Sequence, residues 1–175
     1  MKIAVIGYAS AGKSTFTKRL GATLNLPVLH IDRISFESHW VERDRLAVEK
    51  DMRNFMSKGR WIIDGSYTKL APERFEQADH IFIFKFNRLK CLFGAFYRWI
   101  KYRNQARNSV CDGCIENLNW SFIWWILYDG RKKARRTKFK MYENTYPDKT
   151  IIFKNRRQVN AYLRSVGYDG PFKYE

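Results

Sequence analysis

The chain has 175 residues, of which 45% are hydrophobic, and its 33 Lys and Arg against 17 Asp and Glu give a formal net charge of +16. This length and composition exclude a disordered chain and a pair of full-sized domains, and they predict one globular domain without linkers or repeats. The charge favours anionic partners of three kinds: polyanionic small substrates, nucleic acid or an anionic membrane surface.

The first element is a strand expected over Ile3–Gly7, where a run of apolar and β-branched residues ends in glycine. Gly7 also begins a GxxxxGK[ST] motif, and an apolar face over residues 15–24 predicts a helix directly after it. Backbone amides at such a turn form a nest for an anion. Lys13 would reach the β and γ phosphates of ATP, and the Ser14 hydroxyl would bind Mg²⁺. The residues predicted to bind the nucleotide are Ala9, Ser10, Ala11, Gly12, Lys13, Ser14 and Thr15.

Two carboxylates are expected at the carboxyl ends of the next two strands. Pro27–Ile31 predicts a second buried strand that ends beside Asp32, and Arg60–Gly65 predicts a third strand with Asp64 at its end. Open α/β sheets bind their ligands at this edge. Asp32 would bind Mg²⁺ through water or receive the proton of an acceptor, and the alternative for both carboxylates is a cap or turn residue. His30 is expected to be a core or supporting residue rather than a base.

The rest of the chain continues the alternation of helices and strands, and the near-continuous apolar character of the fourth strand is typical of a parallel sheet covered on both faces. Five strands alternating with helices predict a three-layer α/β fold with a five-stranded parallel sheet. The elements expected from apolar periodicity are a helix over Glu42–Ser57, a strand over His80–Phe84 continued by Lys85 and Phe86, a helix over Arg88–Arg103, a helix over Leu118–Lys140, a strand over Thr150–Phe153 and a helix over Asn155–Val166.

The region between the fourth and fifth expected strands contains a polar loop, an aromatic segment and a basic run. Residues 104–117 break the helical pattern and predict a mobile loop or lid, within a lid region of about residues 98–118. The aromatic residues after it favour core or an interface over a membrane surface. The basic run Arg131–Arg136 is expected at the solvated C-terminal end of a helix, with a grip on a nucleic-acid backbone as the alternative.

No apolar run reaches the roughly 18 residues of a membrane span, and the first strand carries the phosphate loop. We therefore expect a cytoplasmic protein without a cleaved signal or a membrane partner. The three cysteines fit reduced thiols. Cys111 and Cys114 form a single CxxC, but a zinc site would need two further ligands, so a tight turn is expected in place of metal or redox chemistry.

Motifs along nearly the whole chain resemble one family. Besides the phosphate loop, they are Leu26-Pro27, His30-Ile31-Asp32, Trp40, Trp61–Tyr67 (WIIDGSY), Ala78-Asp79, Cys91-Leu92, and Gly113-Cys114 with Glu116. From residue 2 to about residue 165 the chain looks like the bacterial DNA topology modulation proteins, a branch of the adenylate-kinase-like P-loop kinases. The resemblance implies a nucleoside monophosphate kinase-like fold with an acceptor-binding segment after the second strand and an arginine-bearing lid.

The resemblance further implies transfer of the γ-phosphoryl group of ATP, with Mg²⁺, to a small nucleotide-like or nucleoside-like acceptor. The rival hypothesis is a nucleic-acid-binding protein with regulatory or weak ATPase activity, which the +16 charge and the family name suggest. The oligomeric state stays open. The implied catalytic residues are Lys13, Asp32, Arg98, Arg103 and Arg107, and the implied acceptor-binding residues are Asp32, Asp64, Tyr67 and Arg74.

The sequence departs from the family pattern at three positions. Lys85 stands where the family has an aspartate, and Gly94 stands where the lid helix carries an arginine. Asn108 interrupts the Arg-Pro-Asp of the lid. These departures leave the phosphate-binding residues in place and alter the surroundings of the transferring group.

Overall fold

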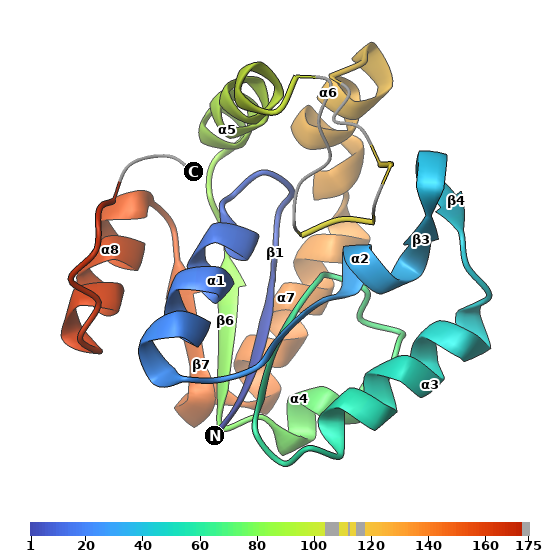
Figure 1. Cartoon of the computed structure of the whole chain (residues 1–175). Coiled ribbons are helices and arrows are strands. Elements are labelled where there is room, and N and C mark those ends of the chain that lie inside the picture. The colour runs from blue at the N-terminus through green and yellow to red at the C-terminus, as the bar shows by residue number, and fades with distance from the viewer. Residues whose placement is uncertain (104–108, 112, 115–117, 173–175) are drawn as a thin grey trace.

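The structure is a computed structural model that describes residues 1–103, 109–111, 113–114 and 118–172. A five-stranded parallel sheet in the order β2-β5-β1-β6-β7 forms its centre (Figure 1). The expected five-stranded α/β architecture is confirmed. The bounds of these strands are Lys2–Gly7 for β1, Val28–His30 for β2, Trp61–Asp64 for β5, His80–Phe84 for β6 and Thr150–Phe153 for β7.

Helices cover both faces of the sheet, which produces three layers. Figure 1 shows α1 (Lys13–Leu24) and α8 (Arg156–Ser165) in front of the sheet and α7 (Lys133–Thr145) behind it. On the front face, the ring of Phe82 lies 5.0 Å from both Phe16 of α1 and Tyr162 of α8. The aromatic core between sheet and helices therefore fixes the position of α1, which begins at the phosphate loop.

Side-chain caps determine where four of the helices begin. In each case an Asp or Asn accepts a hydrogen bond from the amide three residues further on, which satisfies one of the free N–H groups of the first turn. These caps and their helices are Asp44 for α3 (Arg45–Met56), Asn87 for α5 (Arg88–Lys101), Asn119 for α6 (Trp120–Leu127) and Asn155 for α8.

Several short elements do not follow from the sequence pattern. The most consequential is an antiparallel hairpin, β3 (Phe36–Glu37) with β4 (Val41–Glu42), which stands beside the carboxyl edge of the main sheet. Strands of two residues are too short to show a period. The other short elements are α2 (Ile31–Ser35), η1 (Ser38–Trp40), α4 (Glu73–Gln77), η2 (Asp129–Arg131) and η3 (Pro147–Lys149).

The prediction of one helix over Leu118–Lys140 is wrong, because the chain turns sharply between α6 and α7. Gly130 makes this turn possible, since a Cβ there would lie 2.7 Å from the carbonyl oxygen of Trp125. Arg131 then stabilises the end of α6 by donating to the carbonyl of Ile126 at 2.9 Å. The basic run therefore precedes and begins α7, and its placement at a C-terminal helix end is also wrong.

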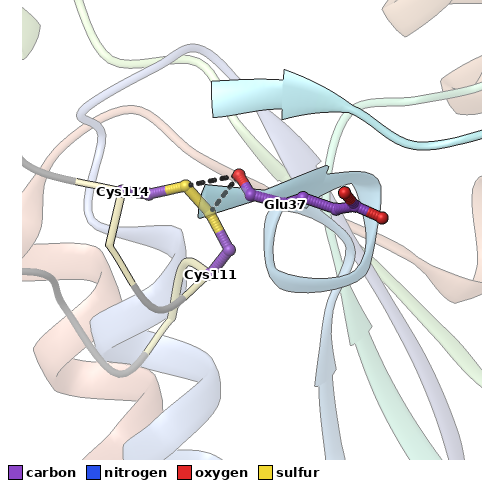
Figure 2. Close-up of a disulfide and its surroundings, with 3 residues drawn as sticks. All are labelled: Glu37, Cys111 and Cys114. Atoms are coloured by element: carbon purple, nitrogen blue, oxygen red, sulfur yellow. Dashed lines mark hydrogen bonds between the residues drawn. A yellow bond between two sulfur atoms is a disulfide. The ribbon is translucent and has the colours of Figure 1, made fainter. Parts of the chain in front are cut away.

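The cysteine pair differs from the expectation of reduced thiols. Cys111 and Cys114 are bonded to each other, and both sulfur atoms lie 3.3 Å from the carbonyl oxygen of Glu37 in β3 (Figure 2). The tight turn is confirmed, since the amide of Cys114 donates to the carbonyl of Cys111. Val110 and Phe36 complete a small apolar cluster around the pair. This cluster joins residues 110–114 of the predicted lid region to the β3–β4 hairpin.

The helices at the carboxyl edge of the sheet expose many apolar side chains. On α5 and α6 these include Phe93, Ile100 and Trp124, whereas Phe122 and Trp125 pack against the core. No helix in the described part of the chain is both long and apolar enough to cross a bilayer.

Candidate functional site

The phosphate loop lies at the carboxyl end of β1 and is shaped by two glycines. Gly7 has a φ of 146°, and a Cβ there would lie 2.5 Å from the carbonyl oxygen of Phe84, so any side chain would push β1 and β6 apart. Gly12 has a φ of 88°, a left-handed conformation that lets the loop turn directly into α1. The chain thus reaches the helix N-terminus with the geometry of an anion-binding nest.

Ser66, just after β5, locks the start of this loop. The amide of Gly7 donates to Ser66 Oγ at 3.1 Å, and the Ser66 hydroxyl donates to the Gly7 carbonyl at 2.7 Å. Lys13 folds back across the loop, and its Nζ donates to the carbonyl of Tyr8 at 2.9 Å. Hydrogen bonds from Ser66 and Lys13 therefore restrain the loop from both sides.

Asp64 is the centre of the polar network beside Lys13. It ends β5 and lies opposite Val5 of β1 and His30 of β2, because neighbouring parallel strands end at the same edge. The Ser14 hydroxyl donates to Asp64 Oδ2 at 2.8 Å, and His30 Nδ1 lies 3.0 Å from the same oxygen. Asp64 is only 4% exposed, and its other oxygen, Oδ1, is buried without a hydrogen-bond partner among the described residues.

The charges of this network depend on one another. Burial raises the pKa of Asp64, but the hydrogen bond from His30, the charge of Lys13 and the hydrogen bond from Ser14 outweigh burial, so the pKa falls below its ordinary value. Burial lowers the pKa of Lys13, and the charges of Asp64 and Asp32 only partly oppose this effect. Lys13 is half-buried and lines the cavity, so a bound anion would stabilise its partly desolvated ammonium group.

Asp32 and Tyr67 form a second polar contact at the same edge. Asp32 lies in α2, directly after β2, and Tyr67 follows β5. Burial raises the pKa of Tyr67 above its ordinary range, and the charge of Asp32 and a hydrogen bond between the two side chains raise it further. Both residues line the cavity, where the neutral Tyr67 hydroxyl is hydrogen-bonded to the Asp32 side chain.

One large cavity of about 980 Å³ joins these groups. Its described lining carries two carboxylates, those of Asp32 and Asp64, so basic side chains outnumber acidic ones three to one. The basic side chains are Lys13, Lys18, Arg33, Arg98, Arg135 and Arg156. Seven aromatic residues also line the cavity, namely Phe36, Trp40, Tyr67, Tyr97, Tyr102, Phe122 and Trp125. This arrangement suits a polyanionic ligand together with a planar ring.

Arg135 is a site residue that the sequence reasoning missed. It lies in the first turn of α7, it lines the cavity, and its Cζ is 4.9 Å from the ring centre of Trp125. Burial lowers its pKa. It forms no hydrogen bond or ion pair with the described residues, so its charge is available to a ligand. The break between α6 and α7 directs Arg135 to the cavity, and no sequence motif marks that break.

Arg131, four residues earlier, is a structural member of the same run. Its guanidinium lies 3.9 Å from the ring centre of Tyr8 and donates to the carbonyl of Phe86 at 3.0 Å and to Cys91 Sγ at 3.1 Å. These contacts join α5, η2 and the phosphate loop. The expectation that the whole run is solvated is therefore wrong for Arg131 and Arg135.

The predicted lid arginines are placed differently from one another. Arg98 lines the cavity, and its Cζ is 5.6 Å from the ring centre of Phe122. Arg103 is exposed over Trp99 and does not line the cavity. Arg107 and Asn108 lie outside the described residues. The described geometry thus brings Arg98 to the site and leaves Arg103 outside it.

The structure does not place Arg74 in the cavity, contrary to its predicted role as an acceptor ligand. Its side chain is 0% exposed, and burial lowers its pKa to about 10. The guanidinium is occupied by backbone oxygens, because the chain between β5 and α4 wraps around it. The carbonyls that it contacts are those of Gly65, Tyr67, Leu70 and Ala71.

Two departures from the family pattern have clear packing explanations. A Cβ on Gly94 would lie 2.4 Å from the carbonyl oxygen of Ser10, so α5 can touch the phosphate loop only because this position lacks a side chain. Lys85 forms an ion pair with Glu143 of α7 and does not line the cavity. Its charge is therefore neutralised away from the phosphate loop.

No protein-family model matches the chain, and no curated protein matches it. Among solved structures it is similar to the shikimate kinases of Bacteroides thetaiotaomicron (16% identity, 95% of each chain, TM-score 0.49) and Aquifex aeolicus vf5 (14%, 95% of this chain and 93% of the other, TM-score 0.48). It is also similar to a deoxyadenosine kinase from M. mycoides with bound dCTP (11%, 95% and 98%, TM-score 0.44). These are distant similarities of fold. The chain's own strand order and phosphate loop define it as a three-layer α/β protein of the P-loop type.

Proposed function

We propose that the chain is an ATP-dependent phosphotransferase that moves the γ-phosphoryl group of ATP to a small nucleotide-like or nucleoside-like acceptor. The observation that supports this most directly is the position of Lys13, half-buried between the phosphate loop and the Asp64 network in a cavity with more basic than acidic side chains. The aromatic part of the wall supports an acceptor with a planar ring. The resemblance to the DNA topology modulation proteins is part of the same proposal.

In this proposal, the chain's residues act by positioning and by neutralising charge, which is the protein's main task in phosphoryl transfer. The amides from Ala9 to Thr15 and the Lys13 ammonium hold the β and γ phosphates. Asp32 orients the acceptor hydroxyl and receives its proton. Arg98 and Arg135 line the same cavity from α5 and α7 and would neutralise charge on the transferring group.

Mg²⁺ fits the residues at the base of the loop. Ser14 offers a hydroxyl, and Asp64 offers a buried carboxylate oxygen without a hydrogen-bond partner in the described structure, which is the oxygen-rich donor set that Mg²⁺ requires. Ser14 and Asp64 are the residues that would hold the ion. When bound, the ion supplies charge neutralisation to the β and γ phosphates.

The proposal is tested by incubating the protein with ATP and a panel of nucleosides, nucleotides and small hydroxylated metabolites, and by measuring ADP and phosphorylated product. We expect one product formed in equal amount with ADP. Lys13→Ala should abolish turnover, whereas Lys50→Ala on the exposed side of α3 should not change it. Turnover that survives in Lys13→Ala would refute the assignment of the phosphate loop.

A variant of Arg135 tests whether this residue contributes to catalysis or to ATP binding. If it stabilises charge that develops during transfer, Arg135→Ala should lower kcat by roughly 100-fold or more and change ATP affinity by only a few-fold. Lys133→Ala, two residues earlier on the exposed side of α7, is the matched control. Equal losses of ATP affinity and kcat would make Arg135 a ground-state ligand of ATP.

Nonspecific nucleic-acid binding remains the alternative function, and the exposed cations at the start of α7 favour it. Lys132, Lys133 and Arg136 are solvated, unlike Arg131 and Arg135. Binding of this kind would weaken steeply with salt and would not require Lys13. A gel-shift titration with duplex DNA at two salt concentrations distinguishes it from phosphotransfer.

A further inference from the structure

The face of α5 that points away from the sheet carries a row of apolar side chains that are exposed among the described residues. Leu89, Phe93, Phe96 and Ile100 follow one another at intervals of four, three and four residues, so they share one side of the helix, and we call this row the α5 ridge. Phe93 is 70% exposed and is the most exposed member. The opposite side of α5 carries Cys91 and Ala95, which are buried in the core. Packing among residues 1–103, 109–111, 113–114 and 118–172 therefore does not explain the ridge.

The surroundings of the ridge are basic. The sequence contains no Asp or Glu between Asp79 and Asp112, and Lys90 and Lys101 on α5 are exposed. At the first turn of α5, the Cζ of Arg88 lies 5.6 Å from the ring centre of Tyr128, which packs at 4.4 Å on the exposed Trp124 of α6. The exposed apolar and aromatic side chains of α5 and α6 are thus accompanied by cations and not by carboxylates.

A hollow of about 320 Å³ lies beside this edge. Arg88, Tyr128, Lys132 and Arg136 are among its lining residues, together with Asp129, which pairs with Lys132 at 2.8 Å. The cations around the hollow exceed the single carboxylate, so it suits a phosphate group. Figure 1 shows α5 and α6 side by side at the same end of the molecule, which places the hollow and the ridge on neighbouring elements.

We propose that the α5 ridge docks on an anionic lipid surface, with the ridge entering the acyl boundary and the hollow beside Arg88 receiving a lipid phosphate. An apolar row bordered by Lys and Arg and accompanied by exposed Trp and Tyr is the pattern of a helix that lies in a membrane interface. This surface lies outside the nucleotide cavity and does not depend on the proposed phosphotransfer.

Charge and chemistry favour lipid over the two other occupants. A second copy would bring Arg88, Lys90 and Lys101 of one chain against the same cations of the other, without a carboxylate on α5 to offset them. Nucleic acid would use the cations and stack on the aromatic rings, but it offers no apolar medium for Leu89 and Ile100. An anionic bilayer satisfies both the charges and the aliphatic side chains.

The test is co-sedimentation of the full chain with vesicles of phosphatidylglycerol and phosphatidylcholine, compared with vesicles of phosphatidylcholine alone. We expect binding to the anionic vesicles only, weakened by high salt. Phe93→Ser/Phe96→Ser and, separately, Lys90→Glu/Lys101→Glu should each weaken binding about tenfold or more. The matched controls are Leu46→Ser, where Leu46 of α3 is 75% exposed, and Lys50→Glu, and both should bind like the unaltered chain.

Because the altered side chains are exposed and do not line the nucleotide cavity, these variants should keep their circular dichroism spectrum and ATP affinity. Absence of vesicle binding, or equal loss in the Leu46→Ser control, would overturn the proposal. Sedimentation of the lipid-free chain as a dimer that Phe93→Ser/Phe96→Ser dissociates, without vesicle binding, would assign the ridge to a second copy. Duplex or single-stranded DNA binding that depends on the ridge, again without vesicle binding, would assign it to nucleic acid.

Discussion

Replacing Gly94 by alanine tests whether the contact between α5 and the phosphate loop governs nucleotide binding. The added Cβ would lie 2.4 Å from the carbonyl oxygen of Ser10, whereas ordinary contact begins at 3.4 Å, so the helix and the loop must separate by about 1 Å. A glycine-to-alanine change inside a helix normally stabilises by about 1 kcal/mol, but overpacking of this kind costs about 1–3 kcal/mol. We therefore expect a net destabilisation of about 0–2 kcal/mol, opposite in sign to the propensity rule.

Gly94→Ala should reduce the free energy of ATP binding by more than it reduces the free energy of unfolding. The start of the loop cannot yield, because Ser66 holds both backbone groups of Gly7, so the shift falls on the peptide of Ser10 within the nest. Losing one hydrogen bond from the displaced peptide to a charged phosphate costs about 1.5–3 kcal/mol, so ATP affinity should fall roughly 10- to 150-fold. Isothermal titration calorimetry with ATP and thermal unfolding of the same samples measure the two quantities.

Gly21→Ala is the control, because its Cβ would also meet an atom at 2.4 Å in a helix, but that atom is Cγ2 of the Val28 side chain. This variant should lose stability and keep its ATP affinity. If Gly94→Ala bound ATP like the unaltered chain and melted at a higher temperature, the inferred contact between α5 and the loop would be refuted.

Three further changes test other contacts. Lys13→Met should lower ATP affinity roughly 10- to 100-fold, because it removes a charge-assisted contact with the phosphates. The same change should raise the melting temperature, because burial lowers the pKa of Lys13 and the charged ammonium destabilises the ligand-free fold. A fall in melting temperature would contradict this reasoning. Folding lowers the pKa of Asp64 from 3.8, so as the pH falls the unfolded chain binds the proton before the folded chain does. The free energy of unfolding contributed by the Asp64 carboxylate is therefore lost as the pH falls below about 4. Asp64→Asn should reduce the difference in unfolding free energy between pH 7 and pH 3, measured by urea unfolding. Arg74→Leu should destabilise the protein by about 3 kcal/mol or more, since several carbonyls lose their donor, and an unchanged urea midpoint would show that water replaces the guanidinium.

The sheet and the phosphate loop can be predicted from the sequence, because buried strands and a turn bounded by glycines have strong local sequence patterns. Asp64 and Asp32 are placed at strand ends for the same reason. His30 was expected to support the site, and it contacts Asp64. These positions depend only on strand order and on where each strand ends, which local apolar runs define.

The positions of Arg74, Arg135 and the cysteine pair could not be predicted, because they depend on contacts between segments that are distant in the sequence. Arg74 resembles a phosphate ligand in the sequence, and only the wrapping of residues 65–71 around it shows that backbone carbonyls occupy it. Arg135 reaches the cavity because Gly130 packs on Trp125 and interrupts a pattern that otherwise predicts one continuous helix. The cysteine pair lies against Glu37, about 75 positions away in the chain, and local spacing carries no such information.

The double hydrogen bond between Ser66 and Gly7 has a thermodynamic consequence for two-substrate binding. Ser66 directly precedes Tyr67, whose hydroxyl is bonded to Asp32, so one short segment touches both the nucleotide loop and the wall expected to receive an acceptor. A molecule that orders Tyr67 would also reduce the freedom of the peptide at Gly7. We expect positive heterotropic linkage, in which the acceptor tightens ATP and ATP tightens the acceptor by the same factor, as closure of the binding cycle requires.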